Sequence, residues 1–149
     1  MMEPGKIKLG ITRIAVPDFA YSGIERAALP EQVMWKFGTK SLADPIHRRL
    51  GILFTTWVHA TEDSNPFLQL TVEMVFDFET LSEFITKEGE VFIPSDLQSA
   101  ILGIVVSTTR GILFTKMMGT SLEGLTLPLI DPTRLVSLQA IAIQVAENE

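Results

Sequence analysis

The sequence contains no cysteine and only two histidines among its 149 residues. Without cysteine, disulfides and thiolate metal sites are excluded for this chain. The patterns HExxH, GxSxG, GxGxxG and the P-loop motif do not occur either, so the common signatures of metalloproteases, serine hydrolases and nucleotide-binding proteins are missing. We therefore predict a non-enzymatic protein with no catalytic residue, no metal and no cofactor.

An excess of positive charge is also missing, because 18 acidic residues outnumber 12 Lys and Arg and give a formal charge of −6. This balance argues against nucleic acid as the main partner. No apolar run reaches about 18 residues without polar breaks, and residues 1–10 lack the apolar region of a signal peptide. We expect a cytoplasmic protein without stable membrane insertion.

Apolar side chains are abundant, at 46% of the residues, and the mean hydropathy is +0.29. A chain of this length fits a single domain, here residues 1–149, with a sizeable core. The apolar content is high for a soluble monomer, so part of the apolar surface is expected to meet another subunit or a ligand.

The charge is distributed unevenly along the chain. Residues 1–61 carry eight basic and five acidic groups, residues 62–96 one and nine, and residues 97–149 three and four. The middle third therefore predicts an acidic surface. Within it, Glu73, Asp77 and Glu79 share one strand face, which we interpret as a solvated sheet face rather than as paired catalytic carboxylates.

The first half of the chain has the period of strands. The expected strands are Ile7 to Val16, closed by Pro17-Asp18, then Gln32 to Thr39, Ile52 to Ala60 and Phe67 to Phe78. In the last of these, every second residue from Leu68 to Phe78 is apolar and most of the others are polar. Alternation of this kind is typical of antiparallel strands with one wet face. The short links between the strands predict an antiparallel meander.

The second half has the period of helices. The stretch from Pro94 to Asp131 begins with a long helix that is apolar nearly all round and ends near Gly119. Such a helix needs cover on two sides, namely the sheet and a second copy of itself across a two-fold axis. A last helix is expected to open at Asp131-Pro132, with Leu135, Leu138, Ile141 and Val145 as its apolar stripe. The predicted fold class is α+β: a four-stranded antiparallel sheet followed by a long helix and a C-terminal helix.

Arg110 is a lone cation inside the apolar helix, so it requires a partner. We expect it to pair with a carboxylate or to cap backbone carbonyls across a subunit interface. The residues predicted to form this interface are Ile104, Thr108, Arg110 and Ile112. On this interpretation Arg110 sets the register of the assembly.

The order and spacing of these features resemble the SecB family of protein-export chaperones, over most of residues 7–140. The segments that carry the resemblance are Ile14–Phe19, Leu29–Glu31, Phe67–Phe78, Arg110 and Leu127–Pro132. Ala28 stands where the family has a tryptophan before its second strand. Ser22 and Thr71 also depart from the family's acidic and apolar positions, so another partner is equally consistent with the sequence.

The resemblance implies a homo-oligomer, either a dimer or a tetramer built as a dimer of dimers, that holds unfolded or precursor polypeptides and hands them to a SecA-type motor. The implied partner-binding acids are Asp18, Glu73 and Asp77. The candidate peptide-binding residues are Trp35, Phe37, Trp57, Phe67 and Phe114, for each of which core packing is the alternative. Two functions remain open: a chaperone for unfolded polypeptides, or an assembly or adaptor protein that binds one specific folded partner.

Overall fold

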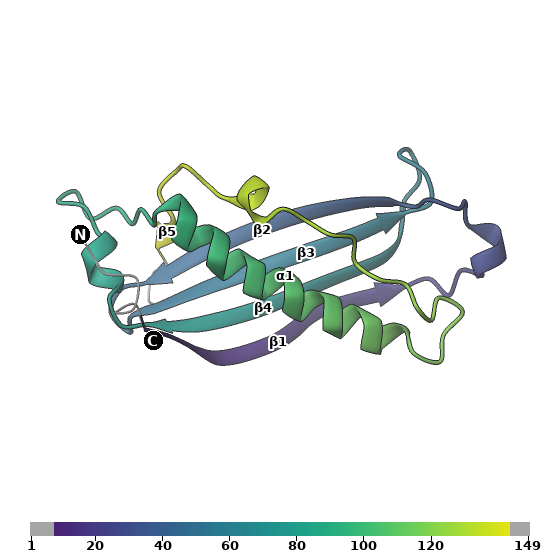
Figure 1. Ribbon diagram of the computed structural model, residues 1–149, viewed down its shortest axis with the longest axis horizontal. Helices are drawn as coiled ribbons and strands as arrows, with labels where there is room; N and C mark the ends of the chain where they lie inside the picture. Colours follow the sequence, from purple (N-terminus) through teal and green to yellow (C-terminus); the bar gives the residue numbers. More distant parts are fainter. Residues whose placement is uncertain (1–7, 144–149) are drawn as a thin grey trace, which may run out of the picture.

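The computed structural model describes residues 8–143, which form one long twisted sheet with a single long helix across one face (Figure 1). The strands are β1 (Leu9–Tyr21), β2 (Met34–Asp44), β3 (Arg49–His59), β4 (Pro66–Phe78) and β5 (Ala142–Ile143). Their order in the sheet is β1-β4-β3-β2-β5. The helix is α1 (Ser95–Met117), and the 3-10 turns are η2 (Arg26–Ala28), η3 (Leu81–Phe84) and η4 (Pro132–Leu135).

The four expected antiparallel strands are confirmed, but the sheet has a fifth strand. β5 pairs in parallel with β2 through Leu42 and Ala43, so the sheet is mixed. Only β2, β3 and β4 form a meander, because β1 pairs with β4 rather than with β2. The segment between β1 and β2 therefore crosses the end of the sheet.

The first strand does not close at Pro17-Asp18 as the sequence predicted. β1 continues to Tyr21, and its register against β4 shifts between Ala15 and Asp18. Proline is tolerated there because β1 is an edge strand, whose outward backbone groups need no neighbour, and because the irregular register already interrupts the ladder. Ile7, where the strand was expected to begin, lies outside the described residues.

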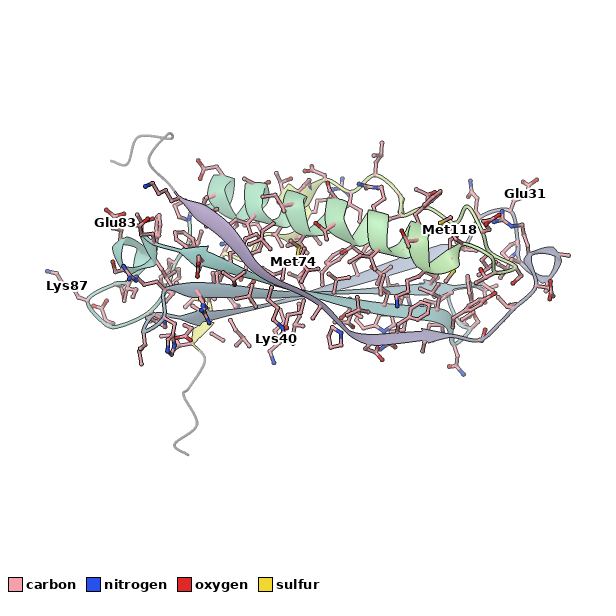
Figure 2. The ribbon with its side chains drawn as sticks, turned by 90° about the horizontal axis from the view of Figure 1, so that it is seen from below. Glu31, Lys40, Met74, Glu83, Lys87 and Met118 are labelled. Carbon is pink, nitrogen blue, oxygen red and sulfur yellow. The ribbon has the colours of Figure 1, made fainter. Side chains whose placement is uncertain are left out.

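The predicted alternation of β4 is confirmed. Leu68, Leu70, Val72, Met74, Phe76 and Phe78 are all at most 1% exposed. Their neighbours on β3 are Ile52, Phe54 and Val58, which are also buried. Figure 2 shows Met74 between the sheet and the helix, and Lys40 on the opposite face. The helix-bearing side is called here the inner face, and the other side the outer face.

The long helix begins and ends close to its expected bounds. Its buried residues are Gln98, Ile101, Leu102, Val105, Val106, Thr109, Leu113 and Met117. They recur at helical spacing and pack over β3 and β4. Gly119 follows the helix with φ at 77°, a left-handed conformation that glycine adopts without strain.

The predicted C-terminal α-helix is wrong for the described residues. Asp131 does cap a turn, since its Oδ1 accepts from the backbone N of Thr133 at 3.0 Å, but the turn is only the 3-10 helix η4. The Gln98 side chain then binds both backbone groups of Ser137, accepting from N at 3.1 Å and donating to O at 2.9 Å. These bonds replace helical ones and leave the chain extended up to β5. Val145, the last residue of the expected stripe, lies outside the described residues.

Candidate functional site

The face of α1 away from the sheet carries an uncharged stripe. Its members, spaced by three or four residues, are all exposed: Ala100, Ile104, Ser107, Gly111, Phe114 and Met118, the last just beyond the helix. The large ones, Ile104, Phe114 and Met118, are 41%, 47% and 58% exposed. The sequence predicted that both sides of this helix are covered. The sheet covers one side, and the helix stripe on the other side faces outward.

Apolar surface continues on the edge strand β1. Ile11 and Ile14 lie opposite Phe76 and Met74 in the register, so they belong to the inner face. Each is nevertheless 50% exposed, because α1 crosses the sheet diagonally and leaves the first half of β1 uncovered (Figure 1). Isolated exposed apolar residues are normal, but a stripe and a neighbouring flank on one side of the molecule indicate an interaction surface.

The residues predicted for the subunit interface do not all lie together. Ile104 is exposed, and Thr108 and Ile112 follow it at four-residue spacing, both half-buried. Arg110 points elsewhere: its Nε donates to the carbonyl of Leu127 at 3.3 Å and its Nη2 to that of Pro128 at 3.0 Å. Arg110 therefore caps backbone carbonyls, as expected, but within its own chain.

The carbonyls that Arg110 binds belong to the crossover, the segment 118–131 between α1 and η4. Leu122 and Leu127 anchor the crossover in the core, with 1% and 2% exposure, whereas Leu129 is 96% exposed. At its start the crossover is tied to the loop after β1, since Ser121 Oγ donates to the carbonyl of Ile24 at 2.7 Å. The crossover is thus held in place by these contacts and exposes Leu129. The sequence pattern did not single out this leucine.

An aromatic row lies on the inner face at the β2 edge. The rings of Trp35 and Phe37 stack at 6.5 Å between centroids, and those of Phe37 and Phe54 at 5.7 Å. Phe54 is fully buried, while Trp35 and Phe37 are half-buried. β5 pairs only with Leu42 and Ala43. Within residues 8–143, residues 34–41 of β2 therefore have no strand beside them on the side away from β3.

The five candidate peptide-binding residues are spread over the molecule. Trp35 and Phe37 lie together, Phe67 is a core residue at 5% exposure, and Phe114 is on the helix stripe. Trp57 lies on the outer face, where its Nε1 donates to Gln69 Oε1 at 3.1 Å. Of the five, only the β2 pair offers a shared aromatic surface.

Trp57 lies flat across the outer face. Its indole reaches Gln69 on β4 at one end and Gly38 on β2 at the other, where an added Cβ would stand 3.0 Å from two ring carbons. Gln69 in turn donates to Asp18 Oδ2 at 2.5 Å. Glycine at position 38 therefore leaves room for the close approach of the ring.

The three predicted partner-binding acids share the outer face, and each already has a partner. Glu73 Oε1 accepts from Arg13 Nε at 2.9 Å, Asp77 Oδ1 lies 3.5 Å from Arg49 Nε, and Asp18 is bound by Gln69. The strands β1 to β4 place four cations and four carboxylates on this face: Arg13, Lys36, Lys40 and Arg49 against Asp18, Asp44, Glu73 and Asp77. The expected acidic surface is wrong for the sheet, whose outer face is balanced.

Two carboxyl groups have a lowered pKa, and both stabilise turns. Burial of Asp44 opposes its ionisation, but hydrogen bonds and charge from His47 outweigh this effect and lower the pKa of Asp44 below its ordinary value. Hydrogen bonds from Thr133 lower the pKa of Asp131. Within residues 8–143 no group of three His, Asp or Glu is arranged to hold a metal ion.

By length and composition α1 is apolar enough to cross a membrane, with a mean hydropathy of 1.5 over its best window. Eight of its residues are buried in the fold. Packing against the sheet therefore accounts for part of its apolar character, and the helix stripe accounts for another part.

The sequence matches no protein-family model and no characterised protein. The structure is similar to a SecB-like chaperone from Mycobacterium tuberculosis, solved in complex with a ChAD peptide from the HigA1 antitoxin, with a TM-score of 0.56 and 14% identity over 82% of this chain and 90% of that chain. A protein of unknown function from Streptococcus agalactiae aligns with a TM-score of 0.35 and 13% identity over 83% of this chain and 98% of that chain. The chain is thus a divergent protein with the SecB-like fold.

Proposed function

We propose that this protein is a non-enzymatic, cytoplasmic chaperone that binds unfolded polypeptides and acts as a homo-oligomer. The observation that carries the proposal is the half-buried pair Trp35–Phe37 beside the unpaired stretch of β2. An extended client adds to such an edge by backbone hydrogen bonds, and its alternate side chains contact the aromatic pair. This mode is tolerant of sequence, as a chaperone requires.

The oligomer in this proposal uses the helix stripe and the uncovered flank of β1. Ala100, Ser107 and Gly111 are small, so two copies of α1 can approach closely about a two-fold axis, with Ile104 and Phe114 packing beside them. The uncharged stripe requires no desolvation of ionic groups. In a dimer, one of these two surfaces is covered. In a tetramer of paired dimers, both the helix stripe and the β1 flank are covered.

A second candidate function is an adaptor that binds one specific polypeptide. It is favoured by the similar mycobacterial structure, in which the chaperone holds a peptide from an antitoxin. Both candidates use the same surface and differ in selectivity.

A SecA-type motor is not included in the proposal. The carboxylates implied for that contact are engaged by Arg13, Arg49 and Gln69. A basic partner would have to displace these groups before it could bind the carboxylates. The new ion pairs would also be exposed, and exposed ion pairs contribute at most about 1 kcal/mol each. The balanced outer face therefore provides little steering for such a partner.

The test of the chaperone proposal is suppression of aggregation of a chemically unfolded model protein at near-stoichiometric ratio. Trp35→Ser is expected to abolish suppression, whereas Trp57→Ser, the same change on the opposite face of the sheet, is expected to retain it. Circular dichroism and urea unfolding establish that both variants are folded. Equal activity of the two variants, or no suppression by the wild-type protein, would contradict the proposal.

Selectivity and assembly are measured separately. Pull-down from the native host that yields a single partner, with no general suppression of aggregation, would favour the adaptor. Sedimentation should show a dimer or tetramer that Ile104→Glu dissociates. A wild-type monomer would remove the argument for the helix stripe.

A further inference from the structure

The outer face contains a hollow of about 360 Å³ that neither the chaperone proposal nor the SecB-like fold explains. Its base is Gly51 on β3, which stands between Leu42 on β2 and Val75 on β4 in the register. Leu53 completes an apolar floor. The hollow exists because Gly51 has no side chain, whereas Leu42 and Val75 on the two neighbouring strands do.

Folding does not require glycine at this position. Gly51 is not among the glycines with positive φ, and an added Cβ would meet only the carbonyl of Leu42 at 3.8 Å, an ordinary contact. At Gly38, by contrast, an added Cβ would stand 3.0 Å from the Trp57 ring, a tight contact. Glycine inside a strand weakens it and often marks a site where a ligand or another chain approaches closely, so Gly51 is a candidate for such a site.

Three cations surround the hollow: Lys40, Arg13 and Arg49. Lys40 forms no ion pair or hydrogen bond within the described part of the chain, and it lies opposite the uncharged Leu53. Arg13 and Arg49 contact Glu73 and Asp77 through Nε, at 2.9 and 3.5 Å. An arginine has five N–H donors, so both retain terminal donors for a further acceptor.

Two carboxylates also line the hollow, Glu73 and Asp44. Glu73 is bound by Arg13, and Asp44 accepts from the backbone N of His47 at 3.2 Å and lies 2.8 Å from its Nδ1. Among the residues that line the hollow, three cations stand against two carboxylates, so the lining carries one excess positive charge. This holds even though the protein as a whole carries a formal charge of −6.

We propose that the hollow is a docking site for an extended segment of a partner protein that presents a glutamate or aspartate beside an aliphatic side chain. The aliphatic group fills the space above Gly51, between Leu42 and Val75. The carboxylate lies at the rim, where Lys40 and the terminal nitrogens of the two arginines provide donors. The site lies on the face opposite Trp35 and Phe37, so it goes beyond the proposed chaperone function and does not depend on it.

A polyanion such as a nucleic acid fits the site less well. Its evenly spaced phosphates would lie against Glu73, Asp77 and Asp44 on the same face as well as against the cations. A single carboxylate needs only the rim around Lys40. The apolar floor also has no counterpart in a phosphate backbone.

The test uses labelled peptides in which leucine and valine alternate with glutamate, with glutamine, or with lysine, measured by fluorescence anisotropy on the full chain. We expect the glutamate peptide to bind most tightly and to weaken with added salt. Lys40→Glu should weaken it about five- to thirtyfold, since an attraction becomes a repulsion. Lys36→Glu, four residues earlier on β2 and outside the hollow, should change affinity less than about twofold.

Gly51→Val fills the hollow without changing any charge. It should reduce affinity about tenfold and leave urea unfolding unchanged or shifted to higher concentration, because valine favours strands. Trp35→Ser should bind the glutamate peptide normally, so failure of this site and failure of the chaperone proposal are distinguishable. Equal binding of the glutamine peptide, normal binding by Gly51→Val, or tighter binding of a single-stranded oligonucleotide that competes with the peptide would each overturn the proposal.

Discussion

Arg110 provides the sharpest test of how the crossover is held. Its Nε and Nη2 donate to the carbonyls of Leu127 and Pro128, so Arg110→Met removes both donors at once. Hydrogen bonds to a charged group contribute about 1.5–3 kcal/mol each. Arg110 and Pro128 are only half-buried, so water replaces part of the loss, and we expect the free energy of unfolding to fall by about 2 kcal/mol in total.

A loss of this size corresponds to a fall in melting temperature of about 4–8 °C for a chain of this length, measured at fixed protein concentration. Hydrogen exchange should locate the effect, with faster exchange in the crossover and unchanged exchange in β4. Arg110→Lys is the matched control. It keeps the cation but loses the planar fork, so about half of the destabilisation is expected.

The same variant separates two roles for Arg110. The sequence suggested that Arg110→Met would loosen assembly, whereas the intramolecular contacts predict loss of stability with the oligomeric mass unchanged. A variant of normal stability and normal crossover exchange, but lower mass in sedimentation, would refute the reasoning. Arg110 would then act across a subunit interface.

Three further predictions concern stability and pH. Thr56 Oγ1 is buried without a hydrogen-bond partner, so Thr56→Val should stabilise the protein by about 1–2 kcal/mol in urea unfolding. Gly38→Ala places a Cβ 3.0 Å from the indole of Trp57, so it should destabilise by about 1–3 kcal/mol and alter tryptophan fluorescence. His47 lowers the folded-state pKa of Asp44, so the β2–β3 turn is stabilised above pH 3.8, the ordinary pKa of the carboxyl group. This stabilisation is lost as the pH falls through the lower folded-state pKa. Asp44→Asn should remove that part of the acid dependence of stability.

Matched variants control these experiments. Thr109 Oγ1 donates to the carbonyl of Val105 at 2.8 Å, so Thr109→Val should destabilise slightly where Thr56→Val stabilises. If both threonine variants shift stability in the same direction, the unpaired hydroxyl is not the cause. A normal fluorescence spectrum for Gly38→Ala, or an unchanged acid limb for Asp44→Asn, would contradict the corresponding contact.

Local patterns predicted the elements that depend on local rules. β4 alternates from Leu68 to Phe78 because one face packs on the core and the other is wet, and α1 ends two residues before Gly119, where the chain turns through a left-handed residue. The sequence missed the extended course of residues 136–141, since it depends on Gln98, which is 39 residues away from Ser137. The helical spacing of Leu135, Leu138 and Ile141 was present, but a tertiary contact overrode it.

The outer face was predicted least well, for the same reason. In the sequence, the acidic residues of 62–96 have almost no basic residues near them. In the fold, however, Glu73 accepts a hydrogen bond from Arg13, which is 60 residues away in the sequence. Trp57 was grouped with Trp35 because both are aromatic, although the alternation along β3 places Trp57 opposite the core. The hollow left one signal in the sequence, an isolated glycine at position 51 inside an apolar strand, and isolated strand glycines do mark close approaches.

The two margins of the sheet limit how far copies of this protein can join. An exposed strand margin is a template on which chains can add without end, as in fibrils. On β1, Pro17 and the shift between Ala15 and Asp18 interrupt the template, and on β2 the template stops where β5 occupies Leu42 and Ala43. Each margin therefore offers a run of backbone of limited length, on β2 residues 34–41, which sets how long a strand from another chain can pair there.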